Sequence, residues 1–196
     1  MARFAGSSSP SASVRGLASR SWLALVALLV ALPVFAALKI GEPAPDFTAQ
    51  ASLDGKVFQF QLSASLRQGP VVLYFYPAAF TPGCTVEAHN FAEAVDQYRA
   101  LGATVIGVSN DSIETLNKFS VSECRSKFAV AADTGQSIMK SYDAVLAYVT
   151  AYASRTSYVI APDGKIIYVY SNMSPDQHVA NTLAALRQWA AAKQRP

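Results

Sequence analysis

The sequence predicts an α/β domain of three layers, with helices on both faces of a mixed β-sheet. Residues 71–76 (VVLYFY) form an unbroken β-branched and aromatic run, typical of a strand buried on both faces. Strand and helix patterns alternate after it, which favours parallel pairing. Residues 156–160 and 165–170 are two further strand patterns joined by a turn at 162–164 (PDG), which predicts an antiparallel hairpin. The sheet should therefore contain both kinds of pairing.

Residues 1–36 have the composition of a targeting segment. Residues 1–21 are rich in serine and contain three arginines and no acid, and residues 22–38 contain no charge. This profile is typical of a signal peptide, with predicted cleavage after Ala36 and residues 37–196 as the mature domain. The predicted location is an exported compartment, the bacterial periplasm. The alternatives are an uncleaved membrane anchor on the periplasmic side and an organelle-targeting peptide.

The net charge of +3 belongs to this N-terminal segment. Three of the 16 basic residues are its arginines, which leaves 13 basic residues against 13 acidic ones in the domain. A neutral domain shows no electrostatic sign of nucleic-acid binding. The two cysteines, Cys84 and Cys124, are too few for a disulfide framework, so one bridge or two separate thiols remain open.

The domain begins with extended structure. Prolines at positions 43 and 45 prevent a helix and predict an extended arm over residues 39–47. A turn at residues 53–56 and an alternating, half-buried strand at 57–61 predict an N-terminal β-hairpin. A polar connection is expected over residues 63–69, before the buried strand.

Helices and strands alternate beyond that strand. The predicted elements are a helix from about residue 85 to Leu101, a strand at 103–109, a helix at 113–128 capped by residues 110–112, a strand at 129–132, a helix at 136–142, the hairpin, and a last helix opened by Pro175. Residues 143–154 are apolar without a clear period and carry no assignment.

Cys84 is the residue that this framework presents for chemistry. Pro77 ends the buried strand, and apolar residues recur at helical spacing from about residue 85, so residues 81–84 (TPGC) occupy the helix N-terminus. Unpaired backbone N–H groups and the positive end of the helix dipole favour a thiolate there over a thiol. Cys84 is therefore the predicted nucleophile.

Residues 77–84 (PAAFTPGC) resemble the Pro-x-x-x-Thr-x-x-Cys motif of the peroxiredoxins. Residues 81–88 (TPGCTVEA) are similar to the bacterioferritin-comigratory, or PrxQ, branch of this AhpC/TSA superfamily, and residues 41–47 and 155–164 resemble two further family segments. The resemblance extends from Lys39 to the C-terminus. It implies a thioredoxin-like three-layer fold and a thiol-dependent peroxidase that reduces hydrogen peroxide and organic hydroperoxides.

The resemblance also implies which partners the chain has. The substrate would be a peroxide, and the reductant would be thioredoxin or another dithiol. Neither a metal nor another cofactor is implied, and a monomer is favoured. A membrane would be a partner only through an uncleaved N-terminal segment.

The same resemblance assigns catalytic roles to Pro77, Thr81 and Arg155 beside Cys84. Pro77 would shield the sulfur, and Thr81 would hold the thiolate or a peroxide oxygen. Arg155 would bring a permanent cation to the sulfur and to the bound peroxide. Two plainer interpretations stay open, because Thr81 could serve only as a helix cap and Arg155 could form a surface salt bridge. Glu87, on the first turn of the helix, either orients Arg155 or complements the helix dipole.

Cys124 is the candidate partner of Cys84. In the commonest PrxQ pattern the resolving cysteine stands five residues after the nucleophile, and His89 occupies that position here. The resemblance then implies that Cys124, near the end of the helix predicted at 113–128, resolves the oxidised Cys84 in an atypical two-cysteine mechanism. That step would need local unwinding, because the sulfurs of a disulfide must approach closely. The alternative is a bystander thiol.

Other polar and aromatic residues receive plain interpretations. His89 and His178 are interpreted as surface residues rather than metal ligands, because no cysteine or acid cluster adjoins them. Tyr142, Tyr148 and Tyr152 are interpreted as core or as a local lid.

Two other functions remain open. A thioredoxin-like disulfide exchange protein would carry Cys-x-x-Cys at the helix start, but Thr81 stands three residues before Cys84. A redox sensor would use the same fold and would be oxidised once, without turnover.

Overall fold

The computed structural model describes residues 1–2 and 37–193. Residues 37–193 belong to one compact unit. The predicted signal peptide or anchor, with cleavage after Ala36, falls on residues outside the described part and stays a prediction. Within the described residues, no helix has the length and apolar character that crossing a membrane requires.

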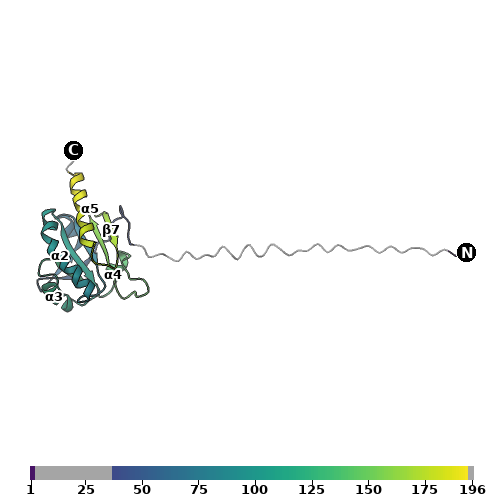
Figure 1. Cartoon of the computed structure of the whole chain (residues 1–196), viewed down its shortest axis with the longest axis horizontal. Coiled ribbons are helices and arrows are strands. Elements are labelled where there is room, and N and C mark those ends of the chain that lie inside the picture. The colour runs from purple at the N-terminus through teal and green to yellow at the C-terminus, as the bar shows by residue number, and fades with distance from the viewer. Residues whose placement is uncertain (3–36, 194–196) are drawn as a thin grey trace. The chain divides into compact units, whose positions relative to one another are not determined.

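A seven-stranded sheet with the strand order β2-β1-β5-β4-β3-β6-β7 forms the centre of the domain (Figure 1). The strands are β1 (Thr48–Leu53), β2 (Lys56–Gln61), β3 (Val71–Phe75), β4 (Thr104–Ser109), β5 (Ala129–Ala132), β6 (Thr156–Ile160) and β7 (Ile166–Ser171). Strand β4 pairs in parallel with β3 and β5, and the remaining pairs are antiparallel. The predicted mixed sheet and both predicted hairpins are confirmed.

Strand β3 separates two hydrophobic cores. All five of its residues are buried, and alternate side chains point to opposite faces. Val72 and Tyr74 belong to one core, with residues of α2 (Pro82–Ala100), α3 (Ile113–Ser122) and α5 (His178–Lys193). Val71, Leu73 and Phe75 belong to the other, with residues of α1 (Leu62–Leu66) and α4 (Ser137–Ser141). Two cores on one sheet make the three layers that the sequence predicts.

A glycine in β4 makes room for a large side chain of the first core. A Cβ atom at Gly107 would lie 2.7 Å from Cζ of Tyr74. The Tyr74 ring stacks on Phe91 of α2 with ring centroids 4.4 Å apart, so it has little freedom to move away. The absence of a side chain at Gly107 therefore sets how closely α2 packs over the sheet.

The helix predicted at 113–128 ends six residues early. Helix α3 stops at Ser122, and Arg125 and Ser126 take left-handed backbone angles with φ of 52° and 55°. The Ser126 N–H turns back to donate to the Ser120 carbonyl at 2.9 Å. Cys124 therefore lies two residues beyond the helix, in a tight turn rather than on it.

Other boundaries also differ from the predictions. The connection predicted at 63–69 overlaps the short helix α1, and the last helix begins at His178 rather than at Pro175. Strand β2 is an edge strand with only Phe60 buried, so its predicted half-buried alternation is wrong. Residues 143–154 contain no helix or strand.

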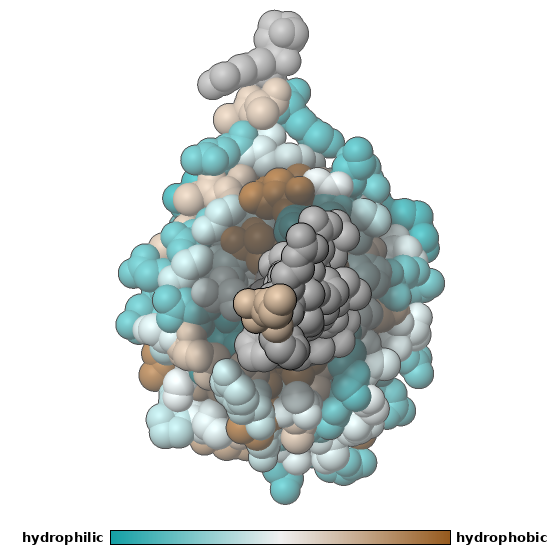
Figure 2. Space-filling view, turned by 90° about the vertical axis from the view of Figure 1, so that its right-hand side faces the viewer, coloured by the Kyte–Doolittle hydropathy of each residue, from teal (hydrophilic) through white to brown (hydrophobic). Residues whose placement is uncertain are grey.

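The aromatic side chains around residues 143–154 divide between core and surface. Tyr142 is fully buried, whereas Tyr148 and Tyr152 are exposed. Figure 2 shows one face of the molecule, on which hydrophobic residues lie in separate groups among hydrophilic ones. Exposed apolar residues scattered in this way need no special explanation.

Candidate active site

The loop between β3 and α2 places Cys84 at the helix start. Thr81 is the N-cap residue with extended backbone angles, Pro82 follows at the first helical position, and Cys84 lies in the first turn. The Thr81 hydroxyl does not cap the helix and donates instead to the Ala78 carbonyl at 2.9 Å. Thr81 is therefore an N-cap by position, and the residue is exposed at the loop surface.

Asp111 fixes this loop from the neighbouring strand. Its Oδ2 atom accepts from the Ala79 backbone N–H at 2.7 Å and from the Ser109 hydroxyl at 2.7 Å. Asp111 was not singled out from the sequence. The available signal was its position just after β4, because the carboxyl ends of neighbouring parallel strands meet at one edge of the sheet.

Sheet pairing brings Arg155 to Cys84. Arg155 immediately precedes β6, whose first residue, Thr156, pairs with Phe75 at the end of β3. The guanidinium Nη2 lies 3.5 Å from the Cys84 sulfur, and both residues are buried, with 4% and 1% of their surface exposed. The prediction that Arg155 meets the Cys84 sulfur matches this contact, and the alternative of a surface salt bridge does not fit a buried side chain.

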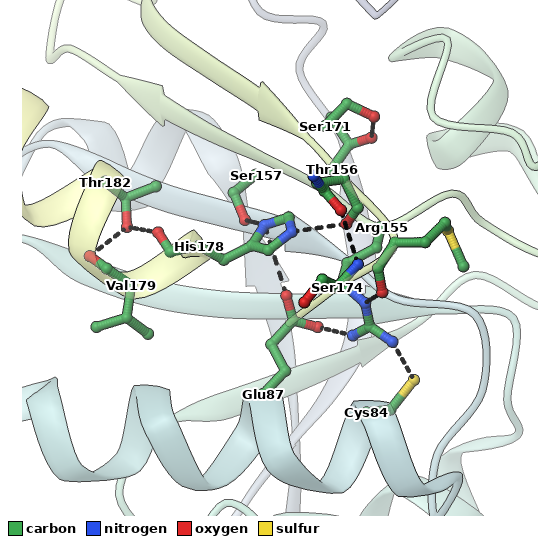
Figure 3. Close-up of polar contacts among 12 residues, drawn as sticks. Cys84, Glu87, Arg155, Thr156, Ser157, Ser171, Ser174, His178, Val179 and Thr182 are labelled. Atoms are coloured by element: carbon green, nitrogen blue, oxygen red, sulfur yellow. Dashed lines mark hydrogen bonds and ion pairs between the residues drawn. The ribbon is translucent and has the colours of Figure 1, made fainter. Parts of the chain in front are cut away.

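Two further partners hold the Arg155 guanidinium in place (Figure 3). Its Nη1 forms an ion pair with Glu87 Oε2, and its Nε donates to the Met173 carbonyl at 2.9 Å. A Cβ atom at Gly83 would approach Nη2 to 3.0 Å, so the glycine leaves space for the guanidinium. Because each nitrogen of the planar fork meets a different acceptor, Arg155 has one orientation, with Nη2 on the sulfur.

Glu87 is a fully buried carboxyl on the helix that carries Cys84. Burial raises the pKa of Glu87 to about 8, and the charge and hydrogen bonds of Arg155 act in the opposite direction. Oxygen Oε2 is paired with Arg155, whereas Oε1 has no hydrogen-bond partner. Of the two roles proposed for Glu87, the structure shows the contact with Arg155.

The prediction that His178 is a surface residue is wrong. His178 is fully buried, with Nδ1 2.8 Å from the Ser157 hydroxyl, Nε2 2.9 Å from the Asn172 carbonyl, and Nδ1 3.6 Å from Glu87 Oε1. Burial lowers the pKa of His178, with Arg155 adding to this and the Asn172 hydrogen bond opposing it. A spacing of four residues from His178 to Thr182 and Leu186, both buried, was the signal that could have placed it inward.

Cys124 and Pro77 complete the predicted set. Pro77 is half-buried and follows β3 after Tyr76. Cys124 is buried in the same core as Cys84, and both cysteines are free thiols. Burial raises the pKa of Cys124 above its ordinary value. The structure therefore brings Cys84, Glu87 and Arg155 into contact and keeps Cys124 as a separate, protonated thiol.

Two partly exposed side-chain contacts, a histidine–carboxylate contact and an arginine–carboxylate ion pair, join the turn that carries Cys124 to helix α2. His89 Nε2 lies 2.9 Å from Glu123 Oε2, and Arg125 Nη1 lies 3.1 Å from Glu93 Oε1. The His89 side chain is 35% exposed, which agrees with its interpretation as a surface residue. No group of three or more histidine, cysteine or acidic side chains in the described ranges is arranged to hold a metal ion.

Comparison with known proteins gives a consistent family. Residues 40–169 match the model of the AhpC/TSA family. The chain is 32% identical over 148 residues to the chloroplastic peroxiredoxin Q of Triticum aestivum, covering 75% of this chain and 66% of that relative's length. It is 33% identical over 156 residues to the chloroplastic peroxiredoxin Q of Populus jackii, covering 79% of this chain and 70% of the relative.

Solved structures show the same fold. Peroxidoxin BcpB from Mycobacterium tuberculosis superposes with a TM-score of 0.70 at 31% identity, covering 77% of this chain and 97% of that one. A cysteine-to-serine mutant of Xylella fastidiosa PrxQ superposes with a TM-score of 0.70 at 25% identity, covering 79% and 99%. The predicted thioredoxin-like α/β fold is confirmed.

The raised pKa of Glu87 predicts how stability depends on pH. The folded state binds a proton at Glu87 more tightly than the unfolded chain does, and this proton binding stabilises the fold. The stabilisation is fully present below the ordinary pKa of 4.5 and is lost as the pH rises to about 8. Between about pH 5 and about pH 8.5, the free energy of unfolding should fall by at least about 1 kcal/mol more in wild type than in Glu87→Gln, measured by urea unfolding.

Glu93→Gln is the control for this measurement, because Glu93 is an exposed glutamate on the same helix. The free energy of unfolding of Glu93→Gln should change with pH as that of wild type does. Parallel pH curves for wild type and Glu87→Gln would contradict the prediction.

Proposed function

The chain belongs to the AhpC/TSA family, and we propose that it is a thiol-dependent peroxidase that reduces hydrogen peroxide and organic hydroperoxides with Cys84 as the attacking thiolate. The observation that carries this proposal is the Arg155 Nη2 atom 3.5 Å from the Cys84 sulfur at the start of α2. A fixed guanidinium and the unpaired N–H groups of a helix N-terminus both stabilise negative charge at that point.

The reaction transfers one oxygen to the sulfur. The Cys84 thiolate attacks one peroxide oxygen, the O–O bond breaks, and the sulfur becomes a sulfenic acid after losing two electrons. The other oxygen leaves with the bonding pair and takes a proton, which gives water from hydrogen peroxide or an alcohol from an organic hydroperoxide. Arg155 faces the sulfur throughout, so its charge stabilises the negative charge that moves onto the departing oxygen.

Pro77 and Thr81 act on the approach to the sulfur. Pro77 has no N–H and a rigid ring, and its half-buried position before the loop suits a role in limiting the access of water and bulky oxidants. The Thr81 hydroxyl donates to the Ala78 carbonyl, and a rotation of its side chain would free it for a peroxide oxygen.

Cys124 resolves the sulfenic acid. Its thiol attacks the oxidised sulfur of Cys84, water leaves, and a disulfide forms between the two residues. Thioredoxin or another dithiol then reduces this disulfide by thiol exchange. Both thiols are buried on separate segments, so the turn after α3 and the first turn of α2 must open locally. The two partly exposed side-chain contacts across that opening, His89 with Glu123 and Arg125 with Glu93, are weak, which keeps the free-energy cost of opening low.

The chain acts as an exported monomer in this proposal. Residues 1–36 would be a signal peptide removed after Ala36, leaving the enzyme in the bacterial periplasm. There are two alternatives. One is an organelle-targeting segment, because the plant relatives are named as chloroplastic proteins, and the other is an uncleaved membrane anchor. The mass of the mature N-terminus, measured on protein from its native source, distinguishes the three.

Replacing the nucleophile tests the peroxidase function. Cys84→Ser should consume peroxide only at the uncatalysed rate, because the hydroxyl of serine is a far weaker nucleophile than a thiolate. The measurement is steady-state consumption of hydrogen peroxide and of an organic hydroperoxide with a thioredoxin system. An unchanged urea midpoint shows that the variant is folded, and turnover retained by Cys84→Ser would overturn the proposal.

Replacing the second cysteine tests the two-cysteine mechanism. Cys124→Ser should still oxidise Cys84 once with one equivalent of peroxide but lose thioredoxin-supported turnover, with the sulfur proceeding to sulfinic acid. In wild type, the same equivalent should produce a Cys84–Cys124 peptide pair in mass spectrometry and a faster band on a non-reducing gel. Full turnover by Cys124→Ser without an internal bridge would replace this mechanism with a one-cysteine enzyme.

A further inference from the structure

One carboxylate oxygen in the active site lacks a proton donor. Glu87 Oε1 is buried and makes no hydrogen bond, although Oε2 of the same group is paired with Arg155. A buried acceptor without a hydrogen-bond partner destabilises the folded state, because it has lost its hydrogen bonds to water and gained none in return. The ionisable side chain that faces it is His178, with its Nδ1 3.6 Å from Oε1 (Figure 3).

The hydrogen bonds of His178 fix which ring nitrogen carries its proton. The Asn172 carbonyl can only accept, so Nε2, at 2.9 Å from that oxygen, is the protonated nitrogen. In the neutral ring Nδ1 is then an acceptor, facing the Ser157 hydroxyl at 2.8 Å and Glu87 Oε1 at 3.6 Å. One additional proton between Nδ1 and Oε1 would give the unpaired oxygen its partner.

The charges around Glu87 and His178 connect a proton between these two residues to the state of Cys84. Arg155 is the permanent cation facing Glu87, and Cys84 lies on the other side of it. Two phenols are further titratable neighbours. Tyr170 packs against the His178 ring with the centroids 4.8 Å apart, and Tyr74 lies near Glu87, where burial raises its pKa well above the ordinary value. If Glu87 were a bare carboxylate, it would neutralise Arg155, and a Cys84 thiolate would add a second buried negative charge.

We propose that Glu87 and His178 share one proton, and that His178 is a positioning residue that in this way leaves the charge of Arg155 available to the Cys84 thiolate. The shared proton sits either on Glu87 Oε1 as a donor to Nδ1 or on Nδ1 as a donor to Oε1, and the pair is neutral overall in both forms. The consequence for peroxide reduction rests on the proposed function, whereas the proton itself does not. Burial acts on both groups in the same sense, because it disfavours the charged form of each and so raises the pKa of Glu87 and lowers the pKa of His178.

A mutant cycle on the full chain measures the effect at Cys84. The readout is the rate constant of Cys84 alkylation by iodoacetamide, with mass spectrometry to separate it from Cys124. Glu87→Gln mimics the protonated carboxyl, so the rate constant of Cys84 alkylation in this variant should lie within about threefold of the wild-type value. That change is smaller than the tenfold factor that corresponds to one pKa unit. His178→Gln keeps a donor for Asn172 but loses Nδ1, and should slow alkylation about tenfold near neutral pH.

The double variant separates a proton-sharing role from a structural one. With Gln at position 87 there is no carboxylate left to neutralise Arg155, so the double variant should recover to within about threefold of Glu87→Gln. A double variant as slow as His178→Gln, or a His178→Gln variant as fast as wild type, would overturn the proposal.

Histidine NMR tests the shared proton without replacing His178. The chain has two histidines, so His89→Gln assigns the ¹⁵N ring signals. The Nδ1 shift of His178 should change between about pH 6.5 and about pH 9 in wild type and stay constant in Glu87→Gln, because the partner that releases the proton is then absent. The same pH dependence in both proteins would refute the sharing, even if His178→Gln proves unable to fold.

The two proposals fail separately. If the cycle and the NMR shifts behave as expected but wild type consumes no peroxide, the proton sharing stands and the peroxidase function falls. If wild type consumes peroxide and the double variant shows no recovery, the function stands and the role of His178 falls.

Discussion

The site depends on one buried positive charge, that of Arg155. Taking a guanidinium out of water is costly unless it is paired and hydrogen-bonded, and Arg155 meets a carboxylate, a backbone carbonyl and a sulfur. The sheet supplies this arrangement, because antiparallel pairing of β3 with β6 brings the segment before Thr156 to the end of β3. Helix α2 starts just beyond that end and carries both Cys84 and Glu87. The position of the cation is therefore a consequence of strand pairing, and the reactivity proposed for Cys84 follows from the cation.

Local sequence patterns were sufficient to predict the parts of the fold that depend on neighbouring residues in the chain. The run in β3, the turn before β7 and residues 81–84 at the N-terminus of α2 each leave a local signature, and the structure has these features where the patterns placed them. The end of α3 was misplaced because residues 123–128 have no helix breaker, and the stop depends on left-handed angles at Arg125 and Ser126. Asp111 and His178 could not be assigned roles locally, because their partners lie on other elements.

The proposed reactivity of Cys84 and its proposed recycling by Cys124 require opposite properties of the core that contains both thiols. A water-poor, fixed site strengthens the interaction between Arg155 and a thiolate, whereas the resolution step that we propose for Cys124 would require both thiols to leave the core. The weak connection in this region is the turn that carries Cys124, because it lies outside α3 and is joined to α2 by two partly exposed side-chain contacts. The rigid part of the site, Arg155 with Glu87 and His178, lies just before β6, on α2 and on α5, and does not include that turn. Opening of the turn after α3 would therefore leave Arg155 and His178 in place, whereas opening of the first turn of α2 would move Cys84 away from Arg155.

The most direct test of this account is the second-order rate constant of Cys84 with hydrogen peroxide in Arg155→Met, compared with wild type and with Arg99→Met. Arg99 is an exposed arginine on α2 that pairs with Asp96 and donates to the Lys127 carbonyl at 2.8 Å, and neither partner contacts Cys84, so its replacement should leave the rate unchanged. Removing the cation from the sulfur should slow the reaction by about 100-fold or more, the effect of losing one fixed charge-stabilising donor in a buried site. A folded Arg155→Met protein that reacts as fast as wild type would contradict the account.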